Sequence, residues 1–470
     1  MTAEGLVVSW QEMTHDSAET SVHSTLNTTA TARLLAHERI VHDSARTAGN
    51  GRIMGRMRLS IMVFLTAALA LSAATPQSPA TRAWPLRVEP LASPSAAGSA
   101  QPQLSVSRRG VLLSWVEKSG DRATLRFAEH TAGGWSAARD VASGSDWFVN
   151  WADVPSVVRL DDGTLAAHWL QKSGADTYAY DVRLSYSKDD GQTWSASFTP
   201  HQDGTRTEHG FASLFQMPGA GLGLAWLDGR AMTSGHAAPG GHGSGDMSLR
   251  FASFGRDWKP TPDAALDLRV CECCPTAAAV TADGPIVAYR NRSADEVRDI
   301  FITRLERGKW SEPVAVSKDE WQFNACPVNG PALSARGRNV AIAWFQAKDG
   351  KPKSMAAFST DAGRTFGAPV RLDEEASLGR VDIELLPDGA AAAAYIDLTG
   401  NRAEFRVRRV DLKGTASAPV TIAPLVNNRS SGYPRMALHG DELVFAWVDA
   451  EGGAPVVRTA SAKLSSGTRP

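Results

Sequence analysis

The chain has 470 residues, and its 49 basic and 50 acidic side chains give a formal net charge of −1. This balance lacks the excess positive charge that nucleic acids and anionic membrane surfaces attract, so we expect no nucleic-acid partner. Glycine and tryptophan are plentiful and long helical patterns are scarce, as in an ordinary folded chain.

Residues 57–74 (MRLSIMVFLTAALALSAA) have the pattern of a secretory signal peptide: a basic flank, an apolar run and small residues at its end. The run is short for a membrane span. Because a signal peptide normally begins a chain, we expect residues 1–56 to be an untranslated or disordered extension, with Met54 or Met57 as the true start. A signal anchor with a small cytoplasmic tail is the alternative.

The signal peptide predicts that the mature protein is exported to the periplasm or the extracellular space, where disulfides persist. We expect no membrane span in the mature chain and a monomer.

The segment 75–103 is rich in alanine, proline and serine and is expected to be a linker that includes one strand near 84–92. Along residues 104–470, a short apolar segment that ends in an aromatic residue recurs roughly every 50 to 60 residues. Its last residues are Trp115, Trp169, Trp226, Tyr289, Trp344, Tyr395 and Trp447. Each segment follows one short strand and precedes two more without a helix, which is typical of a β-propeller blade. We therefore predict an all-β fold, a β-propeller over residues 104–470.

Seven recurrences favour seven blades, and six is the alternative if a terminal repeat is irregular. The last repeat, from Tyr433 onward, supplies only three strands. The segment WPLRVEPLAS at Trp84 is similar to WSEPVAVS at Trp310, which reads as the outer strand of another repeat. We expect this N-terminal strand to complete the last blade, because closure of the ring removes an exposed strand edge.

Two segments in corresponding places share one motif, SKDDGQTW at 187–194 and STDAGRTF at 359–366. In each, the Asp can accept backbone N–H bonds, the Gly can adopt a positive φ, and the aromatic residue can pack between blades. Both resemble the Asp-box, or BNR repeat, of bacterial sialidase-type propellers. The resemblance covers the repeats from Trp84 to Leu464 and implies an exported bacterial branch of the sialidase superfamily.

In a propeller, the loop before each innermost strand and the loop between the second and third strands open on the same end of the central channel. The arginines, carboxylates and tryptophans singled out below nearly all fall in these loops. Arginines, carboxylates and a tryptophan pair around one mouth suit a small polar ligand, an anionic sugar in particular. The candidate ligand-binding residues are Arg230, Arg290, Arg292, Arg380, Arg435, Trp147, Trp151 and Asn329.

The resemblance also implies a hydrolytic hypothesis. Sialidases bind a sugar carboxylate with three arginines and use a tyrosine nucleophile, an assisting glutamate and an aspartate acid. Carried over to this sequence, the catalytic candidates are Tyr433 as nucleophile, Glu208 as its base, and Asp153 or Asp382 as acid, with Arg290, Arg380 and Arg435 for the carboxylate. The sequence lacks the family's Phe/Tyr-Arg-Ile/Leu-Pro motif and predicts seven blades where typical sialidases have six. A non-catalytic binding propeller is therefore the alternative.

Three of the four cysteines, Cys271, Cys273 and Cys274, lie in the stretch CECC, and Cys326 follows far along the chain. Cys274 and Cys326 each precede a proline at the entrance to the innermost strand of neighbouring blades, so a disulfide between them is sterically plausible. Cys271 and Cys273 could then form a tight loop disulfide or remain thiols, and a Cys273–Cys274 bond is also open. Export favours this structural interpretation, without a cofactor.

A metal site is the rival interpretation. The thiolates with His209 could form a soft site for copper or zinc, and the glycine-rich loop 231–247 adds thioether and imidazole groups. These further candidates are Met232, His236, His242 and Met247. The cysteine spacing matches no closed zinc pattern such as paired CxxC motifs.

Overall fold

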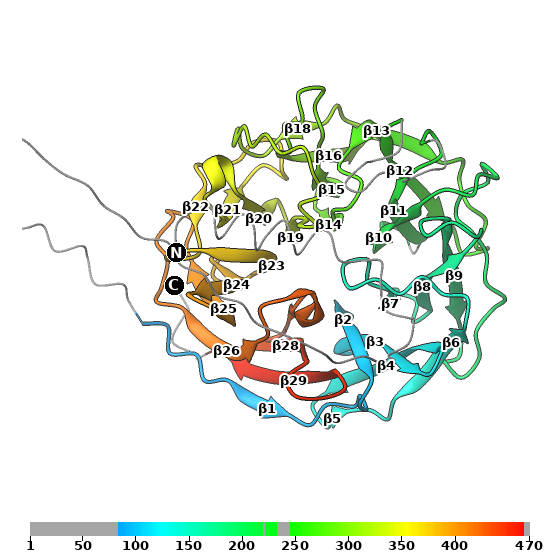
Figure 1. The fold of residues 1–470 in the computed structure, drawn as a ribbon, viewed down its shortest axis with the longest axis horizontal. Coiled ribbons are helices and arrows are strands. Elements are labelled where there is room, and N and C mark those ends of the chain that lie inside the picture. The colour runs from blue at the N-terminus through cyan, green and yellow to red at the C-terminus, as the bar shows by residue number, and fades with distance from the viewer. Residues whose placement is uncertain (1–82, 220, 233–244, 465–470) are drawn as a thin grey trace, which may run out of the picture. The chain divides into compact units, whose positions relative to one another are not determined.

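A computed structural model describes residues 83–219, 221–232 and 245–464 of the protein. These residues form seven antiparallel sheets, and Figure 1 shows them arranged in chain order around a common centre. The extension 1–56 and the signal peptide 57–74 lie outside the described residues. Within the described ranges, no helix has the length and apolarity to cross a membrane.

The first three blades follow one another along the chain. The first contains β2 (Ser99–Val106), β3 (Val111–Ser119) and β4 (Arg122–Thr131), with β5 (Gly134–Trp135) and β6 (Arg139–Gly144) both paired to β4. The second contains β7 (Ser156–Arg159), β8 (Leu165–Lys172) and β9 (Tyr180–Ser187). The third contains β10 (His209–Met217), β11 (Gly221–Asp228), β12 (Met247–Phe254) and β13 (Ala264–Val270).

The next three blades repeat this order. The fourth contains β14 (Ala277–Thr281), β15 (Gly284–Arg290) and β16 (Ile300–Glu306), with β17 (Lys309–Trp310) and β18 (Val314–Ala315) paired to β16. The fifth contains β19 (Ala332–Arg336), β20 (Asn339–Gln346), η1 (Lys348–Gly350), β21 (Lys353–Ser359) and β22 (Val370–Arg371). The sixth contains β23 (Ser377–Leu385), β24 (Ala391–Thr399), β25 (Arg402–Val410) and β26 (Val420–Leu425).

The seventh blade joins the two ends of the domain. After η2 (Arg429–Ser431), it contains β27 (Arg435–His439), β28 (Glu442–Asp449) and β29 (Val456–Lys463), and β1 (Glu89–Leu91) completes it. β1 pairs antiparallel with β29, with Pro90 opposite Ala460. The prediction of seven blades closed by an N-terminal strand is confirmed, and the six-blade alternative is wrong.

The aromatic residues that revealed the repeat belong to the second strands, and most of them lie deep between blades. Trp115, Trp226 and Trp344 are fully buried, and their indole N–H groups donate to Glu117, Asp228 and Asp319 at 2.8, 2.9 and 2.6 Å. A buried aromatic side chain removes enough apolar area from water to contribute on the order of 4 to 6 kcal/mol. Because a polar partner is provided for each indole, that gain is not offset by an unsatisfied donor.

The turns at 187–194 and 359–366 have the same hydrogen bonds. In each, a serine hydroxyl donates to the Asp carboxylate at 2.7 Å, and the Thr amide donates to the same carboxylate at 2.9 Å. Gly191 and Gly363 adopt φ values of +82° and +78°, and a Cβ on Gly191 would lie 2.5 Å from the Phe127 ring of the preceding blade. These turns therefore hold adjacent blades together, at a distance from the polar residues described next.

Candidate metal centre at the channel mouth

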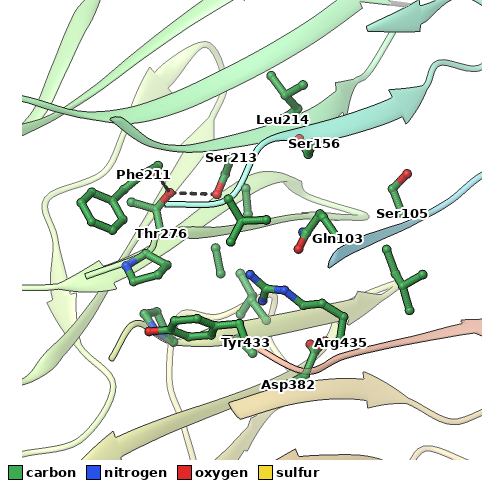
Figure 2. A pocket seen from close by; sticks show the side chains of 18 of the residues that line it. Gln103, Ser105, Ser156, Phe211, Ser213, Leu214, Thr276, Asp382, Tyr433 and Arg435 are labelled. Atoms are coloured by element: carbon green, nitrogen blue, oxygen red, sulfur yellow. Dashed lines mark hydrogen bonds between the residues drawn. The ribbon is translucent and has the colours of Figure 1, made fainter. Parts of the chain in front are cut away.

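The first strands of the blades enclose a cavity of about 230 Å³ at the centre of the ring. Figure 2 shows Tyr433, Arg435 and Asp382 at its wall. Oδ2 of Asp382 accepts from the Met436 amide at 2.8 Å, and burial raises the pKa of this carboxyl. Asp153 also lines the cavity, so both predicted acids lie in the channel.

Tyr433 is held by neighbours other than the predicted base. Its hydroxyl donates to the Val328 carbonyl at 2.6 Å, and its ring stacks on Trp151 with centroids 5.9 Å apart. Arg380 covers Trp151 at 4.5 Å from the ring centroid, and Arg435 lies 5.3 Å from the centroid of Tyr433. Burial raises the pKa of Tyr433, so its phenol remains protonated at neutral pH. Burial thus stabilises the neutral hydroxyl of Tyr433, while the charges of Arg380 and Arg435 act on its pKa in the opposite direction.

The partner of Glu208 is Tyr180, which the sequence analysis did not single out. The Tyr180 hydroxyl donates to Glu208 at 2.7 Å and lies 3.3 Å from Asp153. Burial raises the pKa of Glu208 to about 8 and that of Asp153 to about 7. Tyr180 is also buried, and its ring stacks on that of Phe148 with the centroids 4.0 Å apart. Tyr180 opens the third strand of its blade at the channel mouth, so the loop rule that selected Arg230 and Arg290 could have found it.

Two of the three arginines predicted to bind a carboxylate, Arg290 and Arg380, are engaged by protein atoms, whereas Nε of Arg435 has no hydrogen-bond partner among the described residues. Arg290 donates to the carbonyl oxygens of Asn329 and Phe345, and Arg380 donates to Ser431 Oγ at 2.6 Å. Asn329 in turn accepts from the Arg380 amide at 2.7 Å. These side chains tie neighbouring loops together instead of facing one anion site.

The other predicted binding residues are also engaged in structural contacts. Arg230 forms ion pairs with Asp228 and Asp263, both at 2.6 Å. Arg292 forms ion pairs with Glu272 at 3.0 Å and Glu296 at 2.8 Å. Trp147 stacks on Trp169 with centroids 5.5 Å apart as part of an apolar cluster, so one face of its ring is covered.

All four cysteines converge on one place where blades three to five meet. The Sγ atom of Cys271 lies 3.0 Å from that of Cys274 and 3.7 Å from that of Cys273, and the thiols of Cys273 and Cys326 are hydrogen-bonded. A Cβ on Gly330 would collide with the Pro275 carbonyl oxygen, so a glycine at this position lets the two cysteine loops approach.

None of the four cysteines forms a disulfide in the structure, where a bonded pair would lie about 2.05 Å apart. The structure contains no disulfide between Cys274 and Cys326 or within the Cys271–Cys274 stretch, where the sequence predicts them. Instead, the turn at residues 271–274 brings three thiols together, and Cys326 is hydrogen-bonded to Cys273.

Buried positive charge stabilises a thiolate in this cluster. Nη1 of Arg298 lies 3.2 Å from Cys271 Sγ and 2.8 Å from Glu272, and Arg298 is fully buried. Burial alone would raise the pKa of Cys271, but hydrogen bonds from Cys273 and Cys274 and the charge of Arg298 outweigh burial and hold that pKa well below its usual value. Burial, together with the Cys271 thiolate, raises the pKa of Cys274.

Three of the sulfurs, those of Cys271, Cys273 and Cys274, lie within 4.8 Å of one another. Zinc–sulfur bonds of about 2.3 Å in a tetrahedron separate the sulfurs by about 3.8 Å, close to the 3.7 Å between Cys271 and Cys273, whereas Cys271 and Cys274, at 3.0 Å, would have to move apart to bind one ion. His209 belongs to a different cluster with Asp181, Asp203 and Asp228. Met232 and Met247 pack in an apolar cluster, and the predicted ligands His236 and His242 lie outside the described residues.

No protein-family model and no curated protein matches the sequence. Solved propellers are similar in structure. The polysaccharide lyase Uly1 has a TM-score of 0.50 at 11% identity, over 80% of this chain and 92% of that one. The K499G mutant of NanB sialidase from Streptococcus pneumoniae has a TM-score of 0.42 at 8% identity, over 79% and 95%. Trypanosoma rangeli sialidase has a TM-score of 0.42 at 13% identity, over 71% and 57%.

Proposed function

We propose that this chain is an exported propeller with Asp-box turns that binds a soft metal ion, copper(I) or zinc, on Cys271, Cys273, Cys274 and Cys326. The observation that carries the proposal is that the Sγ atoms of Cys271, Cys273 and Cys274 lie within 4.8 Å of one another, with Cys326 hydrogen-bonded to Cys273, and that none of the four cysteines forms a disulfide. The similarity to the polysaccharide lyase propeller concerns the fold, and the metal function is drawn from the cysteines alone.

The local charge supports the same conclusion. Four thiolates around a divalent ion leave a surplus negative charge that is costly to bury unless cations compensate it. Arg298 contacts Cys271, and the charge of Arg290 acts on the same thiol. Glu272 adds a negative charge but is itself paired with Arg292 and Arg298 at 3.0 and 2.8 Å. Thiolate ligands favour copper(I) and zinc over harder ions.

Native mass spectrometry of the chain, exported through an oxidising compartment and purified without chelator or reductant, tests the proposal. We expect one copper or zinc ion per chain, lost in Cys274→Ser and in Cys326→Ser. The matched control is Asn324→Ser, an exposed position in the same loop as Cys326, which should retain the ion. An ion-free chain lighter by the hydrogens of two disulfides would overturn the proposal.

A small anionic ligand in the central cavity is the second candidate. The Nε atom of Arg435 is buried at the cavity wall and has no hydrogen-bond partner among the described residues. At about 230 Å³, the cavity is smaller than the 300–1,000 Å³ of most ligand sites, so it suits the carboxylate group of a ligand better than an oligosaccharide. Calorimetry with free sialic acid should show binding that Arg435→Gln removes, and equal binding of a neutral sugar would exclude this site.

A further inference from the structure

The cysteine cluster contains one pair of thiols that lie closer together than two ligands of a single ion. Sγ of Cys271 lies 3.0 Å from that of Cys274, whereas sulfurs that share a tetrahedral zinc ion lie about 3.8 Å apart. Both side chains are only 1% exposed. Residues 271–274 also have the Cys-X-X-Cys spacing of redox proteins whose two thiols alternate with a disulfide. This pair is therefore suited to a second chemistry, which is oxidation.

Cys273 is the thiol of this stretch that an oxidant can reach first. It is half-buried, whereas Cys271 and Cys274 are buried, and its Sγ atom lies 3.7 Å from that of Cys271. An accessible thiol is oxidised by peroxide to a sulfenic acid, which condenses with a neighbouring thiol to form a disulfide. The sulfur of Cys271 is in contact with both of the others, so it can take up the oxidation from Cys273 and share it with Cys274.

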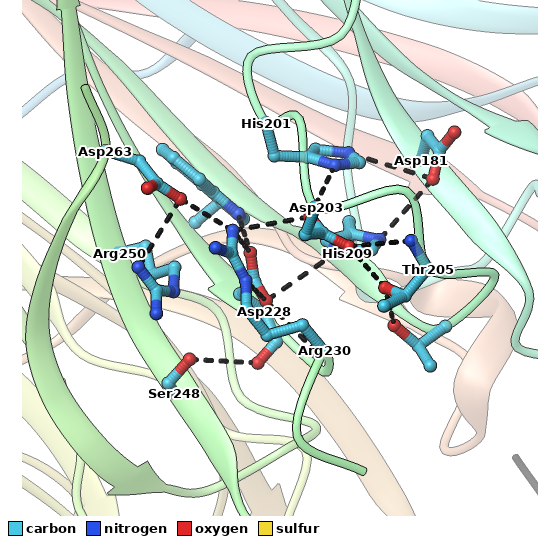
Figure 3. Close-up of polar contacts among 12 residues, drawn as sticks. Asp181, His201, Asp203, Thr205, His209, Asp228, Arg230, Ser248, Arg250 and Asp263 are labelled. Atoms are coloured by element: carbon cyan, nitrogen blue, oxygen red, sulfur yellow. Dashed lines mark hydrogen bonds and ion pairs between the residues drawn. The ribbon is translucent and has the colours of Figure 1, made fainter. Parts of the chain in front are cut away.

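His209, which the sequence associates with the thiols, is engaged elsewhere. Figure 3 shows this ring between Asp181 and Asp203, and its nitrogens lie 3.4 and 3.3 Å from their carboxylates. Burial lowers the pKa of His209, but the two carboxylates outweigh burial and raise it to about 9, so the ring is protonated at neutral pH. A protonated imidazole cannot accept a proton from a thiol, and the chemistry of the cluster depends on its sulfur contacts.

We propose that Cys271 and Cys274 form a disulfide when the protein meets hydrogen peroxide, and that Cys273 is the thiol that passes the oxidation to them. The peroxide transfers one oxygen to the Cys273 sulfur and leaves as water. The Cys271 sulfur attacks that sulfenic sulfur, and a second water leaves as the two sulfurs bond. Cys274 then attacks Cys271 and returns Cys273 to its thiol. In total, two thiols lose two hydrogens and one hydrogen peroxide becomes two waters.

The consequence for the metal centre rests on the function proposed above. A metal-binding cysteine must be a thiolate, so the disulfide removes Cys271 and Cys274 from the set of ligands. The two sulfurs that remain, of Cys273 and Cys326, do not complete a closed site of four ligands. A bound ion and the disulfide therefore compete for the same two sulfurs, and oxidation releases the ion.

Hydrogen peroxide added to the full chain, first reduced and loaded with zinc, tests this inference. Zinc is the probe because copper(I) itself reacts with peroxide. We expect intact mass to show the loss of two hydrogens and of one zinc ion, and a reductant should restore zinc binding. Alkylation followed by fragmentation of the peptides should find Cys273 and Cys326 alkylated and a bond between Cys271 and Cys274.

Variants separate the steps. Cys274→Ser should stop at a bond between Cys271 and Cys273, and Cys273→Ser should stay reduced over the time in which the wild-type chain reacts completely. Asn324→Ser, an exposed position outside the cluster, is the matched control and should react like the wild-type chain. The location of the bond in the wild-type chain needs no substitution, so it decides the question even if a variant fails to fold.

Two results would overturn the inference. One is a bond between Cys273 and Cys326, and the other is further oxidation of Cys273 while Cys271 and Cys274 remain thiols. Equal rates in Cys273→Ser and in the wild-type chain would remove its role in the transfer. A chain that binds no zinc but forms the Cys271–Cys274 bond would support the redox pair and overturn the metal centre alone, so the two failures are distinguishable.

Discussion

The cysteine cluster and the arginines at the channel mouth come from neighbouring loops, yet their polar atoms are satisfied in opposite ways. The guanidinium groups at the mouth donate hydrogen bonds to carbonyl oxygens, carboxylates and a hydroxyl of the protein, as those of Arg290, Arg292 and Arg380 show. The four thiols form no disulfide, and the Sγ atom of Cys271 lies 3.0 Å from that of Cys274. The cysteines are therefore better placed to take up a ligand than Arg290, Arg292 and Arg380, which are already bonded to protein atoms.

Arg298 is where the two regions meet, so its loss should have the largest effect. It contacts Cys271 and forms ion pairs with Glu272 and Glu296, both at 2.8 Å. Arg298→Gln leaves these carboxylates without their buried partner, which should lower the free energy of unfolding by about 3–5 kcal/mol in denaturant titrations and weaken metal binding.

The control for this substitution is Arg364→Gln, which removes ion pairs to Asp283 and Glu306 at a more exposed position. Exposed pairs are screened by water, so the expected loss is under about 1 kcal/mol. Equal losses in the two variants would show that the buried arginine has no special role beside the thiols.

Removal of the metal ion should have the next largest effect. An ion that binds only the folded state stabilises it by about 2.7 kcal/mol when free ion stands at about 100 times its dissociation constant. A thiophilic chelator should therefore lower the melting temperature of the wild-type chain, and restored copper or zinc should raise it again. Cys326→Ser should show neither change, and a chelator response that persists in this variant would place the stabilising ion elsewhere.

The repeat, the blade number and the closing strand could be predicted because they depend on local patterns: an apolar run to Trp226 or Trp344, and a half-repeat at each end of the chain. The loop rule also selected Cys274, Glu208 and Arg290, and the structure places all three next to strand ends. The pairings could not be predicted, because they depend on side-chain directions within tight turns. Glu208 thus pairs with Tyr180 and not with Tyr433, and the turn after Val270 collects three sulfurs instead of a disulfide.

The channel offers a smaller test through Glu384, a partly buried carboxyl on β23. Burial, with a contribution from Asp382, raises the pKa of Glu384 from 4.5 to about 8. Between these values the unfolded chain has released the proton and the folded chain retains it, so the free energy of unfolding falls as pH rises, by at most about 1.4 kcal/mol per pH unit.

Glu384→Gln cannot titrate and should make this decline shallower in denaturant titrations across that interval. The remaining slope would come from Asp153 and Glu208, whose pKa values are also raised. Ser334→Ala is the matched control: it removes a hydrogen bond of 2.9 Å to Glu384 but keeps the acid, so the slope should persist. An unchanged slope in Glu384→Gln would mean that channel water screens this carboxyl.

Tyr433→Phe should have the smallest effect and decides between the two regions most directly. The substitution removes only the hydroxyl that donates to the Val328 carbonyl, so it should lower the free energy of unfolding by about 1 kcal/mol, with the ion stoichiometry unchanged. A nucleophilic Tyr433 would give a different result. The wild-type chain would hydrolyse a sialoside, and Tyr433→Phe would lose this activity at unchanged stability, which would support a catalytic site beside the arginines. Because the phenol is buried and donates its hydrogen bond to a backbone carbonyl instead of to Glu208, we expect the stability change alone.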